Sequence, residues 1–184
     1  MLTSAYLTLL SQPAKDRLIY RFLCRTPVRS ILEMGLGTGV RSRRMVQLAA
    51  RHCPPQDLRY VGVDRFESRT PAVPGWTLKQ AYRALSAAGV RPRLVPGDPY
   101  SALCGTANDL GLVDLVVVSG DEDADAMSRA WAYLPRILRP DSAVFLEEAA
   151  SREPCAQGWR FRRVPWDEIQ ARAREGVRRV RRAA

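Results

Sequence analysis

The stretch ILEMGLGTGVRS, residues 31–42, begins with a short apolar run. Three glycines follow that run directly, at positions 35, 37 and 39. A short apolar run that ends in such a turn is typical of a buried strand leading into a helix. Glycine reaches positive φ without steric cost, and it lets a bulky group approach the main-chain N–H donors at the start of the helix. The stretch therefore predicts a strand, a turn and a helix, with a turn that either binds a nucleotide or is simply tight.

Similar strand and helix patterns alternate on the C-terminal side of this unit. Further apolar runs, each bounded by turn residues, occupy residues 59–63, 93–97, 114–119 and 143–147. Segments long enough for crossover helices lie between the runs, at residues 40–52, 77–89, 101–110 and 123–138. Thr77 and Gly89 predict the ends of the second helix, and Pro140 predicts the end of the last. The alternation predicts an α/β fold with a doubly wound, mostly parallel sheet and helices on both faces.

The length of 184 residues indicates one domain, which we divide into three segments. Residues 1–28 are expected to form N-terminal helices, over 2–10 and 13–24, and residues 29–150 to form the α/β core. Residues 151–184 are expected to add an edge strand and a basic helix that Gly176 interrupts. Residues 65–76 form the longest irregular piece of the core and contain two prolines, which makes them a candidate loop for covering the site.

The positive charge is concentrated near the C-terminus. The net charge is +10, and residues 149–184 hold ten arginines against four acidic residues. Guanidinium groups bind phosphate in a bidentate way, and aromatic side chains at Trp159, Phe161 and Trp166 lie nearby in sequence. This combination is suited to RNA or another anionic partner. A solvated terminus explains the same charge, and a GC-rich genome explains the preference for arginine over lysine.

The cysteines and the single histidine do not suggest a metal site. The cysteines stand singly, with no CxxC pair, at Cys24, Cys53, Cys104 and Cys155. We expect inert thiols in a reducing compartment. His52 stands where the helix after the glycine turn should end, which favours a surface residue over a catalytic base. No stretch approaches the roughly 20 apolar residues that span a bilayer, so we predict a cytoplasmic protein with no membrane partner.

Two common nucleotide-binding motifs fit the glycine turn poorly. A P-loop requires GxxxxGK[ST], whereas Arg41 and Ser42 follow differently spaced glycines and no lysine is present. A dinucleotide-binding turn requires GxGxxG, but Val40 stands where the third glycine should fall. An NAD-dependent oxidoreductase also needs a residue that handles the hydride, and the sequence offers no clear one.

A third motif fits better. Glu33, Gly35, Gly37 and Gly39 form ExGxGxG, which resembles motif I of the class I S-adenosylmethionine-dependent methyltransferases. The resemblance extends in motif order through residues 30–148. It implies a Rossmann-like fold, S-adenosylmethionine as cofactor, and contact between the cofactor and these four residues.

The same resemblance assigns two further cofactor residues. Asp64, in YVGVD, ends the second apolar run and corresponds to the acidic residue that accepts hydrogen bonds from the ribose hydroxyls. Asp98, in VPGDP, corresponds to the acidic residue that reaches the adenine amino group. Asp98 also fits an ordinary turn, and both interpretations stay open.

The segment DLVVVSGDEDADAM, residues 114–127, resembles the fourth-strand pattern of the catechol-type O-methyltransferases. It departs from that branch because Ser119 replaces the metal-binding aspartate and Glu122 replaces the histidine that follows it. Mg²⁺ prefers several oxygen ligands, so we predict no required metal. LRPDSAVFLEE, residues 138–148, resembles the fifth-strand segment, but the chain after it is too short for the terminal hairpin of the family. The C-terminal part is therefore predicted to be reduced.

The resemblance implies methyl transfer to an acceptor that the sequence does not identify. Such transfer depends on positioning and desolvation more than on a specific base. If a proton must leave, the candidate catalytic residues are Asp121, Glu147 and Glu148, because ligands of such sheets bind at the carboxyl ends of the strands. The acidic residues 121–125 also suit a helix start. The alternative function is a non-catalytic methyltransferase-fold protein that binds the cofactor, nucleic acid or another partner.

Overall fold

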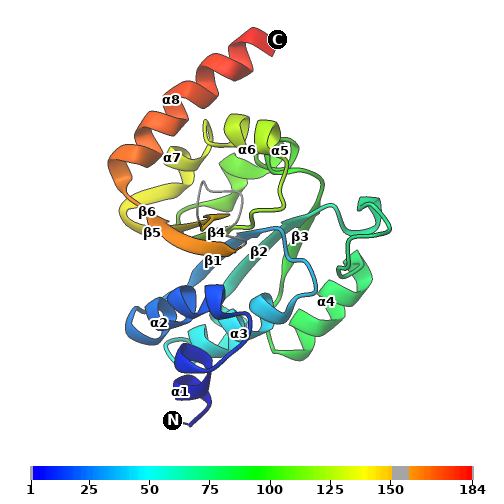
Figure 1. Ribbon diagram of the computed structural model, residues 1–184, viewed down its shortest axis with the longest axis vertical. Coiled ribbons are helices and arrows are strands. Elements are labelled where there is room, and N and C mark those ends of the chain that lie inside the picture. The colour runs from blue at the N-terminus through cyan, green and yellow to red at the C-terminus, as the bar shows by residue number, and fades with distance from the viewer. Residues whose placement is uncertain (1, 151–157, 184) are drawn as a thin grey trace.

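The computed structural model describes residues 2–150 and 158–183, which form one central sheet with helices on both sides (Figure 1). The strands are β1 (Ser30–Met34), β2 (Arg59–Asp64), β3 (Arg93–Pro96), β4 (Val113–Val118), β5 (Leu138–Ala149) and β6 (Trp159–Val164). The helices are α1 (Leu2–Leu9), α2 (Arg17–Arg25), α3 (Val40–Ala49), α4 (Leu78–Ala87), α5 (Pro99–Leu110), α6 (Ala124–Ala130), α7 (Leu134–Ile137) and α8 (Trp166–Ala183). Three short 3-10 helices are η1 (Ala14–Asp16), η2 (Pro55–Asp57) and η3 (Phe66–Ser68).

The sheet has the strand order β3-β2-β1-β4-β5-β6. Strands β1 to β5 run parallel, and β6 pairs antiparallel with β5. The order reverses direction beside β1, so the chain leaves β1 at the point where ligands bind in doubly wound sheets. The carboxyl ends of β1, β2, β4 and β5 therefore meet at one edge, which holds the glycine turn. The predicted mostly parallel, doubly wound sheet is confirmed.

Two hydrophobic cores lie between the layers of the molecule, one on each face of the sheet. One core joins the sheet to α2, α3 and α4, and the other joins its opposite face to α5, α6, α7 and α8 (Figure 1). β1 is buried along its whole length, and five of the six residues of β4 are buried. Near-continuous apolar runs are typical of parallel strands covered on both faces, which explains why the sequence displayed these strands so clearly.

The prediction of one continuous helix over residues 123–138 is wrong. The segment divides into α6 and α7, and the break has a covalent cause. Pro135 has no N–H to donate to the carbonyl of Trp131, and its ring would clash with that carbonyl in a continuous helix. Pro140 does not end the helix either. It lies inside β5, where the register with β4 shifts between Val113 and Leu115.

The predicted interruption at Gly176 is also wrong, because α8 runs unbroken from Trp166 to Ala183. A Cβ at Gly176 would lie 2.9 Å from the nitrogen of Ala132 and from the carbonyl oxygen of Ser128. Glycine is therefore needed for close packing against α6. Ile169 and Ala173 are buried on the same side, so α8 is docked on the protein rather than a solvated terminus.

The predictions for the C-terminal segment fall partly outside the described residues. Residues 151–157, which include the predicted segment boundary and Cys155, lie outside the described residues. After β5, the part of the chain that the structure describes contains one strand, β6, in keeping with the reduced C-terminal part. None of the described helices combines the length and the apolar character that a bilayer crossing requires.

Candidate functional site

The glycine turn connects β1 to α3 and has three left-handed glycines, with φ values of 81° at Gly35, 56° at Gly37 and 71° at Gly39. Only glycine adopts this region without strain, so the backbone alone explains all three residues. Gly39 is the N-cap of α3. The predicted strand, turn and helix are confirmed.

The protein's own side chains approach two of the three glycines. A Cβ at Gly35 would lie 2.6 Å from Cβ of Ser119 and 2.8 Å from Oε1 of Glu122. A Cβ at Gly39 would lie 2.1 Å from ring carbons of Trp76. A Cβ at Gly37 would have no neighbour within 4 Å and would face open space. Gly37 is therefore the glycine that leaves room for a ligand.

Residues 65–76 do cover the turn, as the sequence predicted. The backbone N–H of Trp76 donates to the carbonyl of Gly37 at 2.8 Å, and its ring lies against Gly39. Arg43, in α3, places its guanidinium 5.8 Å from the centre of the same ring. The loop thus has its own contacts with the turn.

Asp64 ends β2 beside the turn and is almost fully buried. Its Oδ2 accepts hydrogen bonds from the N–H groups of Leu36 at 2.7 Å and Gly37 at 3.2 Å, and Oδ1 accepts from the N–H of Phe66 at 2.9 Å. Arg69 also donates to Oδ2 and forms an ion pair with it. The predicted ribose-binding carboxylate therefore lies at the turn, where a guanidinium is its present partner.

Glu33 lies beneath the turn, fully buried. Nε of Arg41 donates to Oε1 of Glu33 at 2.7 Å, and Nη2 of Arg41 donates to the carbonyl of Gly35 at 2.6 Å. The Tyr60 hydroxyl donates to Oε2. Burial raises the pKa of Tyr60 well above its ordinary value, so the hydroxyl stays protonated as a donor. This geometry favours a structural role for Glu33 over the predicted contact with the cofactor.

A cavity of about 720 Å³, which we call the turn cavity, opens over the glycine turn. This volume is within the range of small-molecule and cofactor sites. It is lined by turn residues, by the N-terminal segment, by the covering loop and by the ends of β4 and β5. Its lining includes Gln12, Lys15, Asp16, Gly35, Leu36, Gly37, Thr38, Val73, Pro74, Asp121 and Glu147.

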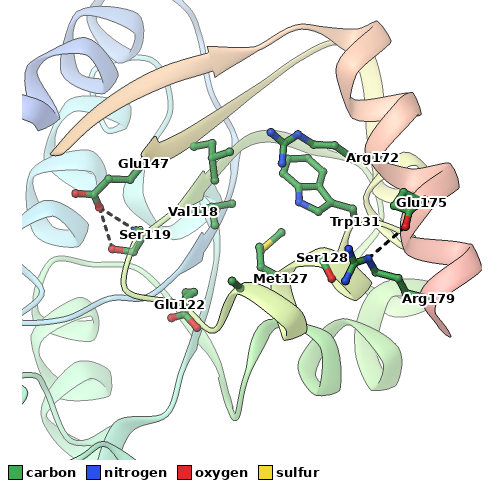
Figure 2. Close-up of a pocket in the computed structure, with 13 residues that line it drawn as sticks. Val118, Ser119, Glu122, Met127, Ser128, Trp131, Glu147, Arg172, Glu175 and Arg179 are labelled. Carbon is green, nitrogen blue, oxygen red and sulfur yellow. Dashed lines mark hydrogen bonds and ion pairs between the residues drawn. The ribbon is translucent and has the colours of Figure 1, made fainter. Parts of the chain in front are cut away.

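A second cavity of about 360 Å³, the α6–α8 cavity, lies between those two helices and the ends of β4 and β5 (Figure 2). Its apolar wall consists of Val118, Met127, Trp131 and Leu146. Arg172, Glu175 and Arg179 of α8 line the opposite side. The guanidinium of Arg172 lies 5.1 Å from the centre of the Trp131 ring.

Ser119 and Glu147 line both cavities, so these residues mark the place where the two meet. Oε2 of Glu147 accepts from the Ser119 hydroxyl at 3.2 Å and from the Gly120 N–H at 3.1 Å (Figure 2). Lys15 reaches Oε1 of Glu147 from the N-terminal segment and forms an ion pair with it. The side chain of Glu147 is thus fixed at the junction.

Glu122 is a site residue that the sequence indicated only as the replacement for a histidine and as a member of an acidic run. It lines the α6–α8 cavity and lies close to Gly35. Burial raises its pKa to about 7, and the nearby carboxylates of Asp121 and Asp64 add to the shift. The sequence shows an acidic run at this point. It does not show which side chain of the run points toward the glycine turn.

The structure separates the other predicted residues. Asp121 lines the turn cavity. Glu148, the next residue after Glu147 in β5, points to the other side of the strand and pairs with Arg160 and Arg162 of β6. It lines neither cavity. Successive strand residues face opposite sides, which accounts for the separation.

Asp98 is the N-cap of α5 and accepts hydrogen bonds from the N–H groups of Tyr100 at 2.9 Å and Ser101 at 3.0 Å. The Ser101 hydroxyl donates to its other oxygen at 2.6 Å. These bonds lower the pKa of the Asp98 carboxyl, although burial opposes them. Asp98 lines neither cavity, and its role toward adenine stays a prediction.

Within residues 2–150 and 158–183, no three His, Cys, Asp or Glu side chains are grouped so that they could hold a metal ion. His52 lies half-buried after α3, with its Nε2 3.0 Å from the carbonyl oxygen of Leu23. Neither cavity includes it.

No protein-family model and no curated protein matches this chain. Solved structures do match it. The O-methyltransferase TomG from Streptomyces achromogenes, solved with SAM, is 19% identical over 99% of this chain and 75% of its own, with a TM-score of 0.56. The calicheamicin methyltransferase CalS11 is 21% identical over 80% and 69%, with a TM-score of 0.57. Cofactor-bound Rv0187 from MTB is 19% identical over 96% and 73%, with a TM-score of 0.53. The chain therefore has the Rossmann-like fold of the S-adenosylmethionine-dependent methyltransferases.

Proposed function

We propose that this protein binds S-adenosylmethionine in the turn cavity and transfers its methyl group to an acceptor in the α6–α8 cavity. The observation that carries the proposal is Gly37, which has a left-handed backbone, lines a cavity of cofactor size and has open space where a Cβ would stand. The fold, which is shared with the O-methyltransferase TomG solved with SAM, supports the same conclusion.

The residues present suit the cofactor, with one rearrangement. Asp64 is oriented by three main-chain N–H groups, so it has a fixed carboxylate to offer the ribose hydroxyls. Arg69 now occupies that carboxylate. We infer that the hydroxyls take the place of the Arg69 guanidinium, and that Arg69 moves away together with part of the covering loop.

The cofactor supplies an electrophilic methyl group, and the protein supplies position and a dry environment. Val118, Met127 and Trp131 are almost fully buried in the wall of the α6–α8 cavity, where they exclude water from the acceptor. Glu147 and Glu122 lie where the acceptor would meet the methyl group. A carboxyl group with a pKa of about 7, as at Glu122, is suited to taking a proton near neutral pH.

The size of the α6–α8 cavity favours a small acceptor, because about 360 Å³ is near the lower end of the range of ligand sites. Its apolar wall favours a ring or an alkyl part, and Arg172 and Arg179 on the opposite side favour an anionic substituent.

The test is calorimetric titration of S-adenosylmethionine into the wild type, Asp64→Ala and Asp114→Ala. Asp114 is a matched control because it also accepts two main-chain hydrogen bonds, from Arg29 at 2.9 Å and Ser30 at 3.0 Å, at the opposite end of the sheet. We expect the wild type and Asp114→Ala to bind alike and Asp64→Ala to bind at least tenfold more weakly. No binding by the wild type, or equal binding by Asp64→Ala, contradicts the proposal.

The alternative is a non-catalytic protein of this fold that binds RNA or another anion. Two observations favour it: Arg69 and Trp76 occupy the turn, and Arg178, Arg181 and Arg182 are exposed on α8. Under this alternative, alanine at these three arginines reduces the salt dependence of RNA binding, because fewer counterions are released. An unchanged salt slope removes α8 from RNA binding. The cytoplasmic location stays a prediction.

A further inference from the structure

Asp16, the last residue of η1, carries a buried carboxylate whose pairing is incomplete. The residue is 2% exposed and lines the turn cavity. The Tyr20 hydroxyl donates to Oδ2 at 3.2 Å. Oδ1 has no hydrogen-bond partner among the residues that the structure describes. A buried carboxylate oxygen without a partner is costly, so it indicates a missing donor.

The nearest cationic side chains have other partners. Arg41 donates to Glu33 and to the carbonyl of Gly35, and Lys15 pairs with Glu147. Burial raises the pKa of Asp16 in spite of the opposing charge of Arg41. A cation in the turn cavity would counteract that shift and satisfy Oδ1.

The position of Asp16 relative to Asp64 identifies which part of a ligand it would meet. η1 packs against β6, and the neighbouring Lys15 reaches β5. In the sheet, β5 and β6 lie on one side of β1, and β2 with Asp64 lies on the other. The two carboxylates therefore flank the glycine turn, and a ligand that places its ribose at Asp64 directs its other end toward Asp16.

We infer that Asp16 binds the ammonium group at the amino-acid end of the cofactor. The inference rests on the proposed function. Glu33, the acidic residue of the motif, is not available for this contact, because Arg41 and Tyr60 engage both of its carboxylate oxygens. The arrangement gives the ammonium a carboxylate acceptor from a segment outside the motif. It also gives the N-terminal segment a direct part in closing the turn cavity.

The experiment compares two ligands that differ only at this end. S-adenosylhomocysteine carries the ammonium and carboxylate, whereas 5′-methylthioadenosine has the same adenosine and sulfur without them. Both are titrated by calorimetry into the wild type and Asp16→Asn. We expect Asp16→Asn to bind S-adenosylhomocysteine about tenfold or more weakly, because a charge-assisted hydrogen bond is lost. Binding of 5′-methylthioadenosine should change less than about twofold.

The control variant is Asp109→Asn, which removes one negative charge from a side chain that is 71% exposed on α5, away from both cavities. It should bind both ligands as the wild type does. Equal binding of S-adenosylhomocysteine by the wild type and Asp16→Asn overturns the inference and leaves the proposed function standing. Equal losses for both ligands also overturn it. Binding of neither ligand by the wild type overturns the proposed function itself, and the inference with it.

Discussion

The turn cavity and the α6–α8 cavity meet at Ser119 and Glu147 but are built in different ways. The floor of the turn cavity is main chain from a few consecutive residues, shaped by the φ values of three glycines. The α6–α8 cavity is walled by side chains from β4, α6, β5 and α8, which are distant in sequence. A site made of main chain is visible in a local motif. A site made of side chains depends on how helices dock, and no short stretch of sequence records that.

The largest expected effect concerns the glycines themselves. Gly39→Ala should lower the free energy of unfolding by about 3 kcal/mol, because its Cβ meets Trp76 and its left-handed backbone is strained. Gly37→Ala should cost only about 1 kcal/mol, from strain alone, yet weaken S-adenosylhomocysteine binding. Urea unfolding and calorimetry measure both. Equal destabilisation by the two variants would show that Trp76 does not lie against the turn as described.

The next effect concerns Glu122, a buried titrating group in the lining of the α6–α8 cavity. Its folded pKa of about 7 lies above its ordinary value of 4.5, so the folded state holds the proton more tightly. Stability from this group is complete below pH 4.5 and is lost as the pH rises to 7.

Glu122→Gln should therefore gain stability relative to the wild type between pH 4.5 and 7, on the order of 2 kcal/mol, and no more above pH 7. Unfolding curves at several pH values measure the gain, with exposed Asp109→Asn as the control. A gain that does not depend on pH contradicts the burial of this carboxyl.

The docking of α8, which forms one wall of the α6–α8 cavity, is tested by two glycines in helices. Gly105→Ala, in α5, has nothing within 4 Å of its new Cβ and should stabilise the protein by about 1 kcal/mol through helix propensity. Gly176→Ala gains the same propensity but meets the main chain of α6, so it should destabilise by about 1–2 kcal/mol. Thermal unfolding compares them. Stabilisation by both changes means that α8 is not in close contact with α6.

The smallest effect concerns Arg69, whose guanidinium pairs with Asp64, the carboxylate that we propose for the ribose. Arg69→Ala should bind S-adenosylhomocysteine about fivefold more tightly, a gain of about 1 kcal/mol, because no ion pair has to open. Arg65→Ala, at an exposed position of the same loop, should leave the affinity unchanged. Weaker binding by Arg69→Ala would show that Arg69 contacts the ligand instead of opposing it.

The sequence predicted the elements whose cause is local. The five parallel strands, the glycine turn, the cap at Thr77 and the position of Asp64 all follow from patterns a few residues long. The predicted cap at Thr77 is confirmed, and the structure adds a reciprocal bond from the Thr77 N–H to the Gln80 side chain.

The features that were missed depend on long-range packing. Asp16 and Glu122 become site residues only when η1 and the chain after β4 meet at the turn. The continuity of α8 at Gly176 depends on the surface of α6. The split between α6 and α7 is different, because Pro135 is visible in the sequence and its effect on a helix is local.

The most direct measurement is a crystal structure of the protein with S-adenosylhomocysteine. We expect the ligand to lie across Gly37, with its ribose hydroxyls on Asp64 and the Arg69 guanidinium displaced. A crystal soaked at saturating ligand in which Arg69 still holds Asp64, and no ligand lies over the turn, would contradict it.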